Sequence, residues 1–243
     1  MYIIKLDAID STNTYLKDMV SVNLPKDYTV VVAEQQTKGR GQMGTKWQAE
    51  IGKNLTASVF KHFSDFKVEN QFYISMVVSL AISKALDKFQ IPQLHIKWPN
   101  DILSADKKIC GILIENVIKN NKFQGSVIGF GLNVNQKFFD DLPQASSMNL
   151  LTGIVYNKDE VLSQILKHLQ VYFKQLENQK YKALKAEYET NLFRKDKPST
   201  FRLPNNEIFL GIIRGVTEAG KLKVWTEDEI IKTFDLKDLT LLY

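Results

Sequence analysis

The chain has 243 residues, a formal net charge of +5 spread along its length, one cysteine and three separated histidines. Charge this mild and dispersed does not indicate nucleic-acid binding, one cysteine excludes an internal disulfide, and the scattered histidines offer no metal-ligand spacing. The length suffices for one large and one small domain. No apolar run approaches the roughly 18 residues that span a bilayer, and the first residues lack a secretory signal. We therefore expect a cytoplasmic protein away from membranes.

The first half of the chain combines short strand-like segments with one long helical pattern. Residues 2–6 (YIIKL) are typical of a strand, and Asp10 or Ser11 is placed to cap a short helix over residues 12–19. Residues 70–89 carry an apolar face wide enough for a helix packed on a sheet. Further strands of one sheet are predicted for five short β-rich segments: 30–33, 54–60, 94–98, 109–116 and 126–134.

The second half begins with another amphipathic helix and then changes character. After Asn157, apolar residues recur at steps of three and four: Val161, Ile165, Leu169, Tyr172 and Leu176. After Pro198 the helical period is lost, and turn-forming residues at 204–206, 219–220 and 227–229 separate short strands. We therefore predict a large domain over residues 1–194 and a small β-barrel over residues 195–243 that docks on it.

A glycine-rich basic loop follows the strand at residues 30–33. It contains three glycines and three cations: Lys38, Gly39, Arg40, Gly41, Gly44 and Lys46. Glycines let the backbone approach a ligand closely, and cations beside exposed N–H groups suit a phosphate or a carboxylate. The spacing matches neither a Walker A loop nor a dinucleotide fingerprint. A flexible surface hairpin has a similar composition, so the loop alone leaves both interpretations open.

Three further segments have both a binding and a purely structural interpretation. Lys97 lies near a strand end before a turn, either in a ligand groove or as a solvated side chain on an open sheet face. Gly129 and Gly131 interrupt a strong strand, which either admits a ligand or marks a bulge or a tight packing site. Residues 10–13 read as a helix cap, but the same helix N-terminus can present donors to a polar ligand.

Six blocks, taken in order, closely resemble the catalytic domain of biotin–protein ligases. They are DSTN at 10–13, AEQQTKGRGQMGTKW at 33–47, NL at 54–55, KWPNDI at 97–102, KKICGILIE at 107–115 and IGFGLNV at 128–134. The resemblance covers roughly residues 1–185 and extends more weakly to the tail, which looks like the small SH3-like domain of that family. It implies an α+β fold, a mixed β-sheet with helices on one side, related to class II aminoacyl-tRNA synthetases and lipoate ligases.

The resemblance also implies a two-step reaction. The carboxylate of biotin attacks the α-phosphorus of ATP, which enters with Mg²⁺, and biotinyl-5′-AMP and pyrophosphate form. A lysine amine of a biotin carboxyl carrier protein, as in acetyl-CoA carboxylase, then attacks the mixed anhydride. Both steps gather negative charge that needs a cation nearby.

The matching positions imply a role for each residue of the site. Lys97 and Arg40 resemble the catalytic residues, with the Lys97 ammonium between carboxylate and phosphate. Ser11, Thr12 and Gln36 resemble residues that hydrogen-bond the ureido ring, where each unpaired buried polar group costs roughly 1–3 kcal/mol. The full implied biotin set is Ser11, Thr12, Asn13, Gln36, Gly39, Arg40, Gly41, Lys97, Gly129 and Gly131. The implied nucleotide set is Gln42, Trp47, Asn100, Lys108 and Asn133, with Asp101 supporting the nucleotide or its magnesium.

The chain departs from the family pattern at Gln42 and Met43, where many relatives carry an arginine, and at Thr45, which is basic in some. Fewer cations in this loop predict weaker retention of biotinyl-5′-AMP. The sequence starts directly at the first catalytic strand, so we expect no DNA-binding helix-turn-helix and no control of transcription. An exposed edge strand suits either a homodimer or a carrier docking surface, and the sequence does not separate the two.

Two other functions compete with the biotin ligase. A lipoate or octanoate ligase shares the fold but has to accommodate a flexible acyl chain, and Ser11, Thr12, Asn13 and Gln36 favour the ureido ring of biotin. A non-catalytic biotin or nucleotide binder is expected to lack the lysine at position 97, and Lys97 is present.

Overall fold

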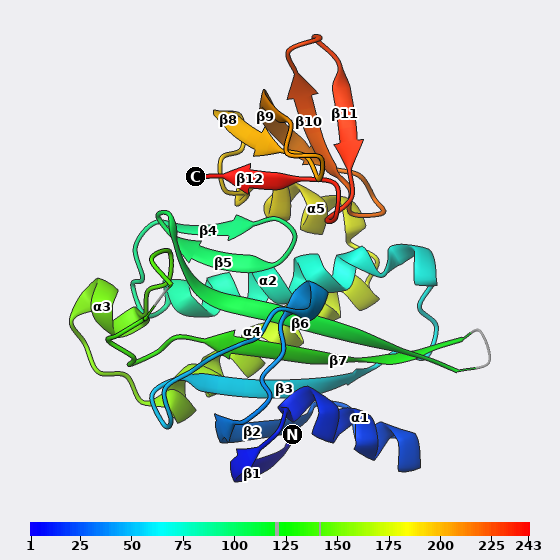
Figure 1. The fold of residues 1–243 in the computed structure, drawn as a ribbon. Coiled ribbons are helices and arrows are strands. Elements are labelled where there is room, and N and C mark those ends of the chain that lie inside the picture. Colours follow the sequence, from blue (N-terminus) through cyan, green and yellow to red (C-terminus); the bar gives the residue numbers. More distant parts are fainter. Residues whose placement is uncertain (120–121, 141) are drawn as a thin grey trace.

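A seven-stranded mixed sheet forms the larger part of the computed structural model, which describes residues 1–119, 122–140 and 142–243 (Figure 1). Its order is β1-β2-β3-β7-β6-β5-β4, with β1 and β2 parallel and the other neighbours antiparallel. The strands are β1 (Tyr2–Ile9), β2 (Thr29–Gln36), β3 (Leu55–His62), β4 (Leu94–Lys97), β5 (Asp101–Ser104), β6 (Lys107–Lys119) and β7 (Lys122–Leu132). The predicted mixed sheet is confirmed.

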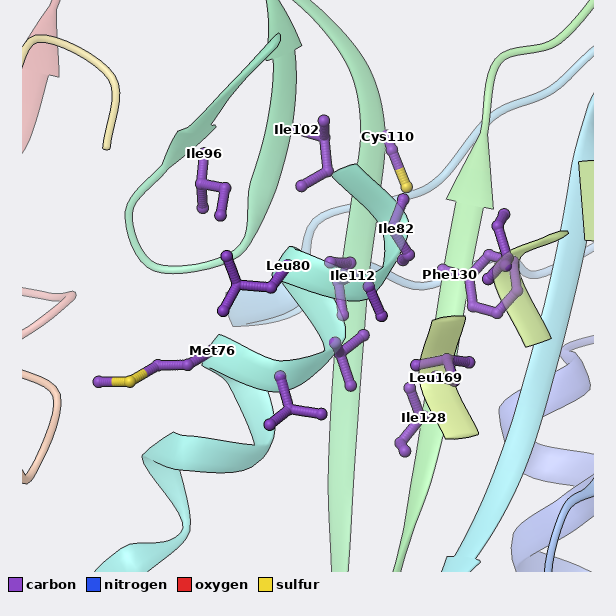
Figure 2. Close-up of a cluster of buried hydrophobic side chains, with 14 of the residues drawn as sticks. Met76, Leu80, Ile82, Ile96, Ile102, Cys110, Ile112, Ile128, Phe130 and Leu169 are labelled. Atoms are coloured by element: carbon purple, nitrogen blue, oxygen red, sulfur yellow. The ribbon is translucent and has the colours of Figure 1, made fainter. Parts of the chain in front are cut away.

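Helices cover both faces of this sheet. The long helices α2 (Phe72–Asp87) and α4 (Lys158–Glu177) pack together on one face, where their apolar side chains meet those of β6 and β7 (Figure 2). The first helix, α1 (Thr12–Val22), packs on the opposite face through Leu16, against Val31 and Phe60. The expectation of helices on one side only is therefore wrong. Strands β2 and β3 are apolar on both faces, so both faces have to be covered.

Side-chain caps define where two helices begin. The Ser11 hydroxyl accepts a hydrogen bond from the N–H of Thr14 at the start of α1, and Asn157 accepts from Asp159 and Glu160 at the start of α4. Two short helices were not predicted, α3 (Met148–Thr152) and α5 (Tyr181–Thr190). Within the described part of the chain, no helix is both long and apolar enough to cross a membrane.

A second, five-stranded antiparallel sheet lies beyond the β4 edge of the first and is consistent with an SH3-like domain (Figure 1). Its order is β11-β10-β9-β8-β12, formed by β8 (Pro198–Arg202), β9 (Ile208–Val216), β10 (Leu222–Thr226), β11 (Ile231–Phe234) and β12 (Thr240–Leu242). The predicted turns at 204–206, 219–220 and 227–229 separate these strands. Trp98, just after β4, donates from its indole Nε1 to the carbonyl of Gly220 at 2.9 Å and so joins the two sheets.

Candidate functional site

A cavity of about 270 Å³ lies where α1, the loop after β2, the centre of the large sheet and the loop after β4 meet. Leu236, from the second sheet's last loop, also contributes to its wall. Fourteen of the predicted site residues line this cavity: Ser11, Thr12, Asn13, Gln36, Arg40, Gly41, Gln42, Trp47, Lys97, Asn100, Asp101, Lys108, Gly129 and Gly131. Segments that are far apart in the sequence are thus brought to one place.

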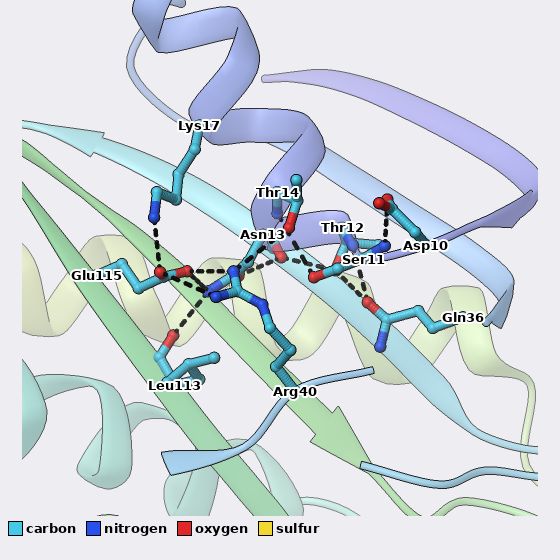
Figure 3. Close-up of polar contacts among 11 residues, drawn as sticks. Asp10, Ser11, Thr12, Asn13, Thr14, Lys17, Gln36, Arg40, Leu113 and Glu115 are labelled. Atoms are coloured by element: carbon cyan, nitrogen blue, oxygen red, sulfur yellow. Dashed lines mark hydrogen bonds and ion pairs between the residues drawn. The ribbon is translucent and has the colours of Figure 1, made fainter. Parts of the chain in front are cut away.

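The N-terminus of α1 forms the polar end of this cavity (Figure 3). Both the backbone N–H and the hydroxyl of Thr12 donate to Gln36 Oε1, at 2.8 and 3.0 Å. Ser58 of β3, which is buried and was not predicted, lies 2.7 Å from the Thr12 hydroxyl and donates to Asn13 Oδ1 at 2.6 Å. The hydroxyl and amide groups at this end are therefore fixed in direction before any ligand arrives.

Two glycines of β7 make room for side chains of the protein itself. A Cβ on Gly129 would lie 2.2 Å from Asn13 Oδ1, and one on Gly131 would lie 2.2 Å from Cε2 of the Trp47 indole. Gly39, in the loop, faces the carbonyl of Trp47 in the same way, with a Cβ contact of 2.4 Å. The close approach that these glycines permit is therefore that of Asn13 and the Trp47 loop onto the sheet.

Glu115 of β6 collects donors from three residues, two of α1 and one of the loop after β2, and was not predicted (Figure 3). It pairs with Arg40 Nη2 at 3.0 Å and Lys17 Nζ at 2.8 Å, and it accepts from Asn13 Nδ2 at 2.9 Å. Burial raises the pKa of this carboxyl, but the hydrogen bonds from Lys17 and Asn13 and the Arg40 charge outweigh burial, so the pKa is lowered overall. One sequence signal was available, because Glu115 is the one acidic residue of β6 and directly follows the apolar residues Ile112, Leu113 and Ile114.

Lys97 ends β4 and lies at the junction of this cavity with a second one of about 480 Å³. Burial lowers the pKa of its ammonium, while the Asp101 carboxylate opposes this shift and the Lys108 ammonium adds to it. Its Nζ lies 4.7 Å from the ring centroid of Tyr243. Lys97 is thus half-buried between two cavities, which does not match a solvated lysine on an open sheet face.

The second cavity has a more apolar wall, including Phe139, Leu142 and Pro143. Trp47 lines both cavities, and its indole Nε1 is buried with no hydrogen-bond partner among the described residues. Asn133 lines only this second cavity, where its Nδ2 donates to the carbonyl of Ser146 at 2.9 Å.

Polar residues at the floor between the cavities are already paired. The Asp101 carboxylate lies 2.8 Å from Lys108 Nζ, and Asn100 donates through Nδ2 to the carbonyl of Ile112. Among the residues that the structure describes, no group of three or more His, Cys, Asp or Glu side chains is placed to hold a metal ion.

The model of the Biotin/lipoate A/B protein ligase family matches residues 6–133, more than half of the 243 residues. The chain belongs to this family. Among relatives of this biotin/lipoate ligase, the Bifunctional ligase/repressor BirA of Bacillus spizizenii is 27% identical over 238 residues, which are 96% of this chain and 72% of that protein. The Biotin--[acetyl-CoA-carboxylase] ligase of Mycobacterium tuberculosis is 29% identical over 215 residues, 87% of this chain and 79% of the relative.

Solved structures agree with this family assignment. The biotin protein ligase from Aquifex aeolicus in complex with biotin and ATP has a TM-score of 0.82 and 27% identity. The match covers 99% of this chain and 98% of the Aquifex aeolicus chain. The R40G mutant of that protein in complex with biotin has a TM-score of 0.81 and 27% identity. The predicted family and fold are confirmed for this biotin/lipoate ligase, while the roles of single residues stay predictions.

Proposed function

We propose that the chain attaches biotin to a lysine of a biotin carboxyl carrier domain, using ATP and passing through biotinyl-5′-AMP. The observation that carries this proposal is the position of Lys97 at the junction of two cavities, one ending in fixed hydroxyl and amide groups and one larger and more apolar. The structural relatives from Aquifex aeolicus bind biotin and ATP, and the family's members join an acid to a protein.

The smaller cavity suits biotin because its end wall matches a ureido ring. The ring is neutral and polar, so each buried N–H and C=O needs a partner. The Ser11 hydroxyl and the Gln36 amide supply such groups, and Thr12 holds the Gln36 amide in place. The valerate chain would then run toward Lys97, where the carboxylate meets the ammonium. A flexible acyl acid such as lipoate leaves the polar end wall unpaired, at a cost of roughly 1–3 kcal/mol for each group.

In the first step, a carboxylate oxygen of biotin bonds to the α-phosphorus of ATP while the bond from that phosphorus to the bridging oxygen breaks and pyrophosphate leaves. Two anionic groups approach each other, and the Lys97 ammonium offsets both charges. It does so without first having to break another ion pair. Its half-buried position strengthens the effect, since water screens it less. The loop carrying Arg40 covers the site and protects the anhydride from water.

The larger cavity is the proposed nucleotide site. Trp47 offers a flat ring and an unpaired indole N–H on its wall, Lys108 adds positive charge, and Asn133 fixes the loop that closes it. Asn100, through its bond to Ile112, and Asp101, through its pair with Lys108, hold the floor. Mg²⁺ enters with ATP as part of the substrate, bound to its phosphates.

In the second step, the amine of a carrier lysine attacks the carbonyl carbon of the adenylate and AMP leaves. The carrier belongs to biotin-dependent carboxylases, one of which is named in the Mycobacterium tuberculosis relative. The proposed place of both steps is the cytoplasm.

The test is biotin-dependent exchange of labelled pyrophosphate into ATP, with lipoate and octanoate in parallel. Lys97→Ala is the active-site variant, and Lys84→Ala, an exposed lysine of α2, is the matched control. We expect exchange with biotin alone, lost in Lys97→Ala and kept in Lys84→Ala. Exchange with the acyl acids only would favour a lipoate or octanoate ligase. The absence of exchange with all three acids would favour a binding protein.

A further inference from the structure

We propose that Tyr243, on the second sheet's side of the site, is a positioning residue for Lys97: its ring face holds the ammonium at the junction of the two cavities. This inference rests on the proposed function. It assigns a task in adenylate formation to a residue that lies 146 positions from Lys97 in the sequence, outside every block that resembles the ligase family.

The contact itself is a cation on a ring face. Lys97 Nζ lies 4.7 Å from the Tyr243 ring centroid, within the roughly 6 Å at which a ring quadrupole attracts an ammonium. Tyr243 lines the larger cavity, and Lys97 lines both. The ring therefore meets the ammonium from the proposed nucleotide side and leaves its other side open to the smaller cavity.

The lysine needs such a contact because little else fixes its direction. Within the described part of the chain, Lys97 Nζ makes no hydrogen bond and no ion pair, since the Asp101 carboxylate is taken by Lys108 at 2.8 Å. A free lysine side chain has about 2 kcal/mol of rotamer entropy, which has to be lost when it bridges two substrates. A ring face reduces this freedom in advance without occupying the ammonium's three N–H donors.

Tyr243 is itself held in place by two separate parts of the fold. Its ring meets the Phe193 ring edge-on, with centroids 5.1 Å apart, and its carbonyl accepts from Gln144 Nε2 at 2.7 Å. Phe193 in turn donates from its backbone N–H to the carbonyl of Ile96, the residue next to Lys97, at 2.8 Å. Lys97 belongs to β4, and the Tyr243 ring packs on Phe193, which is hydrogen-bonded to the same strand.

The same arrangement explains why the small sheet takes part in the site. It contributes Leu236 to the wall of the smaller cavity, while Tyr243 contributes to the larger one. Gln144 belongs to the loop that closes the larger cavity, so its bond to Tyr243 links that loop to the small sheet. Displacing the small sheet would therefore release both the lysine and the loop.

The experiment compares Tyr243→Phe, which keeps the ring face, with Tyr243→Leu, which keeps an apolar side chain but has no ring. Tyr2→Leu, which removes an exposed tyrosine of β1, is the matched control. In biotin-dependent pyrophosphate exchange we expect Tyr243→Leu to lose roughly 3- to 30-fold in kcat, the range of a partly desolvated cation–π contact, with the KM for biotin nearly unchanged. Tyr243→Phe and Tyr2→Leu should stay close to the parent protein.

A second readout follows the lysine without requiring activity. In lysine ¹³C NMR, with the Lys97 signal assigned from its loss in Lys97→Arg, the Lys97 pKa should fall in Tyr243→Leu, because the ring stabilises the charged form. It should not move in Tyr243→Phe. An unchanged Lys97 pKa and an unchanged kcat in Tyr243→Leu would overturn the inference, as would an equal loss in Tyr243→Phe. If the parent protein shows no exchange, the proposed function fails, and the NMR titration still decides whether Tyr243 holds Lys97.

Discussion

Glu115 and Lys97 are opposite cases of a charged side chain at the site. Glu115 is enclosed by Lys17, Arg40 and Asn13, and its side chain is only 20% exposed. Lys97 has a ring beneath it but no ion pair among the described residues. The enclosed carboxylate joins α1 to the loop after β2, whereas the proposed function needs an ammonium that is not already paired.

The enclosed carboxylate makes stability depend on pH. Because its partners lower the pKa of Glu115 in the folded protein, its contribution is present above the ordinary value of 4.5 and is lost as the pH falls through the lowered pKa. We expect Glu115→Gln to reduce the free energy of unfolding more at pH 7 than at pH 3. Urea unfolding of both proteins at the two pH values measures this, and an equal difference at both would contradict it.

Gln42 sets a second expectation at the residue scale. It lines the smaller cavity, at a position where the family resemblance implies an arginine in many relatives. We expect Gln42→Arg to slow release of biotinyl-5′-AMP by roughly ten-fold, the effect of one added charge-assisted hydrogen bond to the phosphate. Release is measured by chasing labelled adenylate from the enzyme. Gln170→Arg, which adds the same charge on the exposed side of α4, should leave release unchanged, and equal rates in Gln42→Arg and the parent would contradict the idea.

Helix α1 and strand β3 form one polar unit at the element scale. Ser58 reaches from β3 to both Thr12 and Asn13 of α1, on the face that otherwise packs through Leu16. The helix therefore presents its N-terminus to the cavity in a fixed direction. This unit, more than any single residue, determines the polar end wall.

Removing the Ser58 hydroxyl should loosen this unit. We expect Ser58→Ala to cost roughly 1–3 kcal/mol of unfolding free energy, because buried groups lose a partner, and to raise the KM for biotin. Ser79→Ala is a sharp control, since the Ser79 hydroxyl is equally buried but has no partner among the described residues. Its removal should be neutral or stabilising. Equal costs for the two variants, measured by denaturant unfolding, would contradict this account.

Elements with strong local patterns were predictable, and the others depend on tertiary contacts. Helices α2 and α4 carry long apolar faces, and α4 begins directly after Asn157, as predicted. Strand β5 has four residues and a register shift against β6, and α3 has five residues, so neither offers a readable period. Ser58 and Glu115 escaped notice because their contacts with Asn13 span 45 and 102 residues.

At the scale of the whole molecule, the two sheets meet at the loop that follows Lys97. Trp98 bonds to Gly220, and the Tyr188 hydroxyl donates to the carbonyl of Pro99 at 2.7 Å. Gly220 has a φ of +90°, and a Cβ there would lie 2.3 Å from the Phe72 ring of α2. The loop after Lys97 is thus held from two sides. The division between residues 194 and 195 remains a prediction, and the second sheet itself begins at Pro198.

A glycine pair tests this junction. Gly220→Ala combines backbone strain with overlap on Phe72, and Gly153→Ala, at φ +76° with open space around it, carries the backbone strain alone. We expect Gly153→Ala to cost about 1–2 kcal/mol of unfolding free energy, and Gly220→Ala to cost a further 1–3 kcal/mol from overpacking. Chemical denaturation of both variants measures this. Equal losses would show that the Gly220 contact does not hold the sheets together.

The family resemblance located the cavity from short blocks, because those blocks include the start of α1, the loop after β2, the loop after β4 and parts of β6 and β7 that line it. It did not reveal what the second sheet adds, since Leu236 and Tyr243 lie outside those blocks. Their contribution depends on how the sheets dock. Such contacts join residues with no common local pattern, so only the three-dimensional structure brings them together.

The most direct measurement is the amount of biotinyl-5′-AMP formed in a single turnover from biotin and labelled ATP, without carrier protein, by the parent protein and Lys97→Ala. The account predicts rapid formation of bound adenylate by the parent and a rate lower by roughly 10²- to 10³-fold in the variant, the usual effect of losing one preorganised charge. A folded Lys97→Ala that forms adenylate at the parent's rate would contradict it.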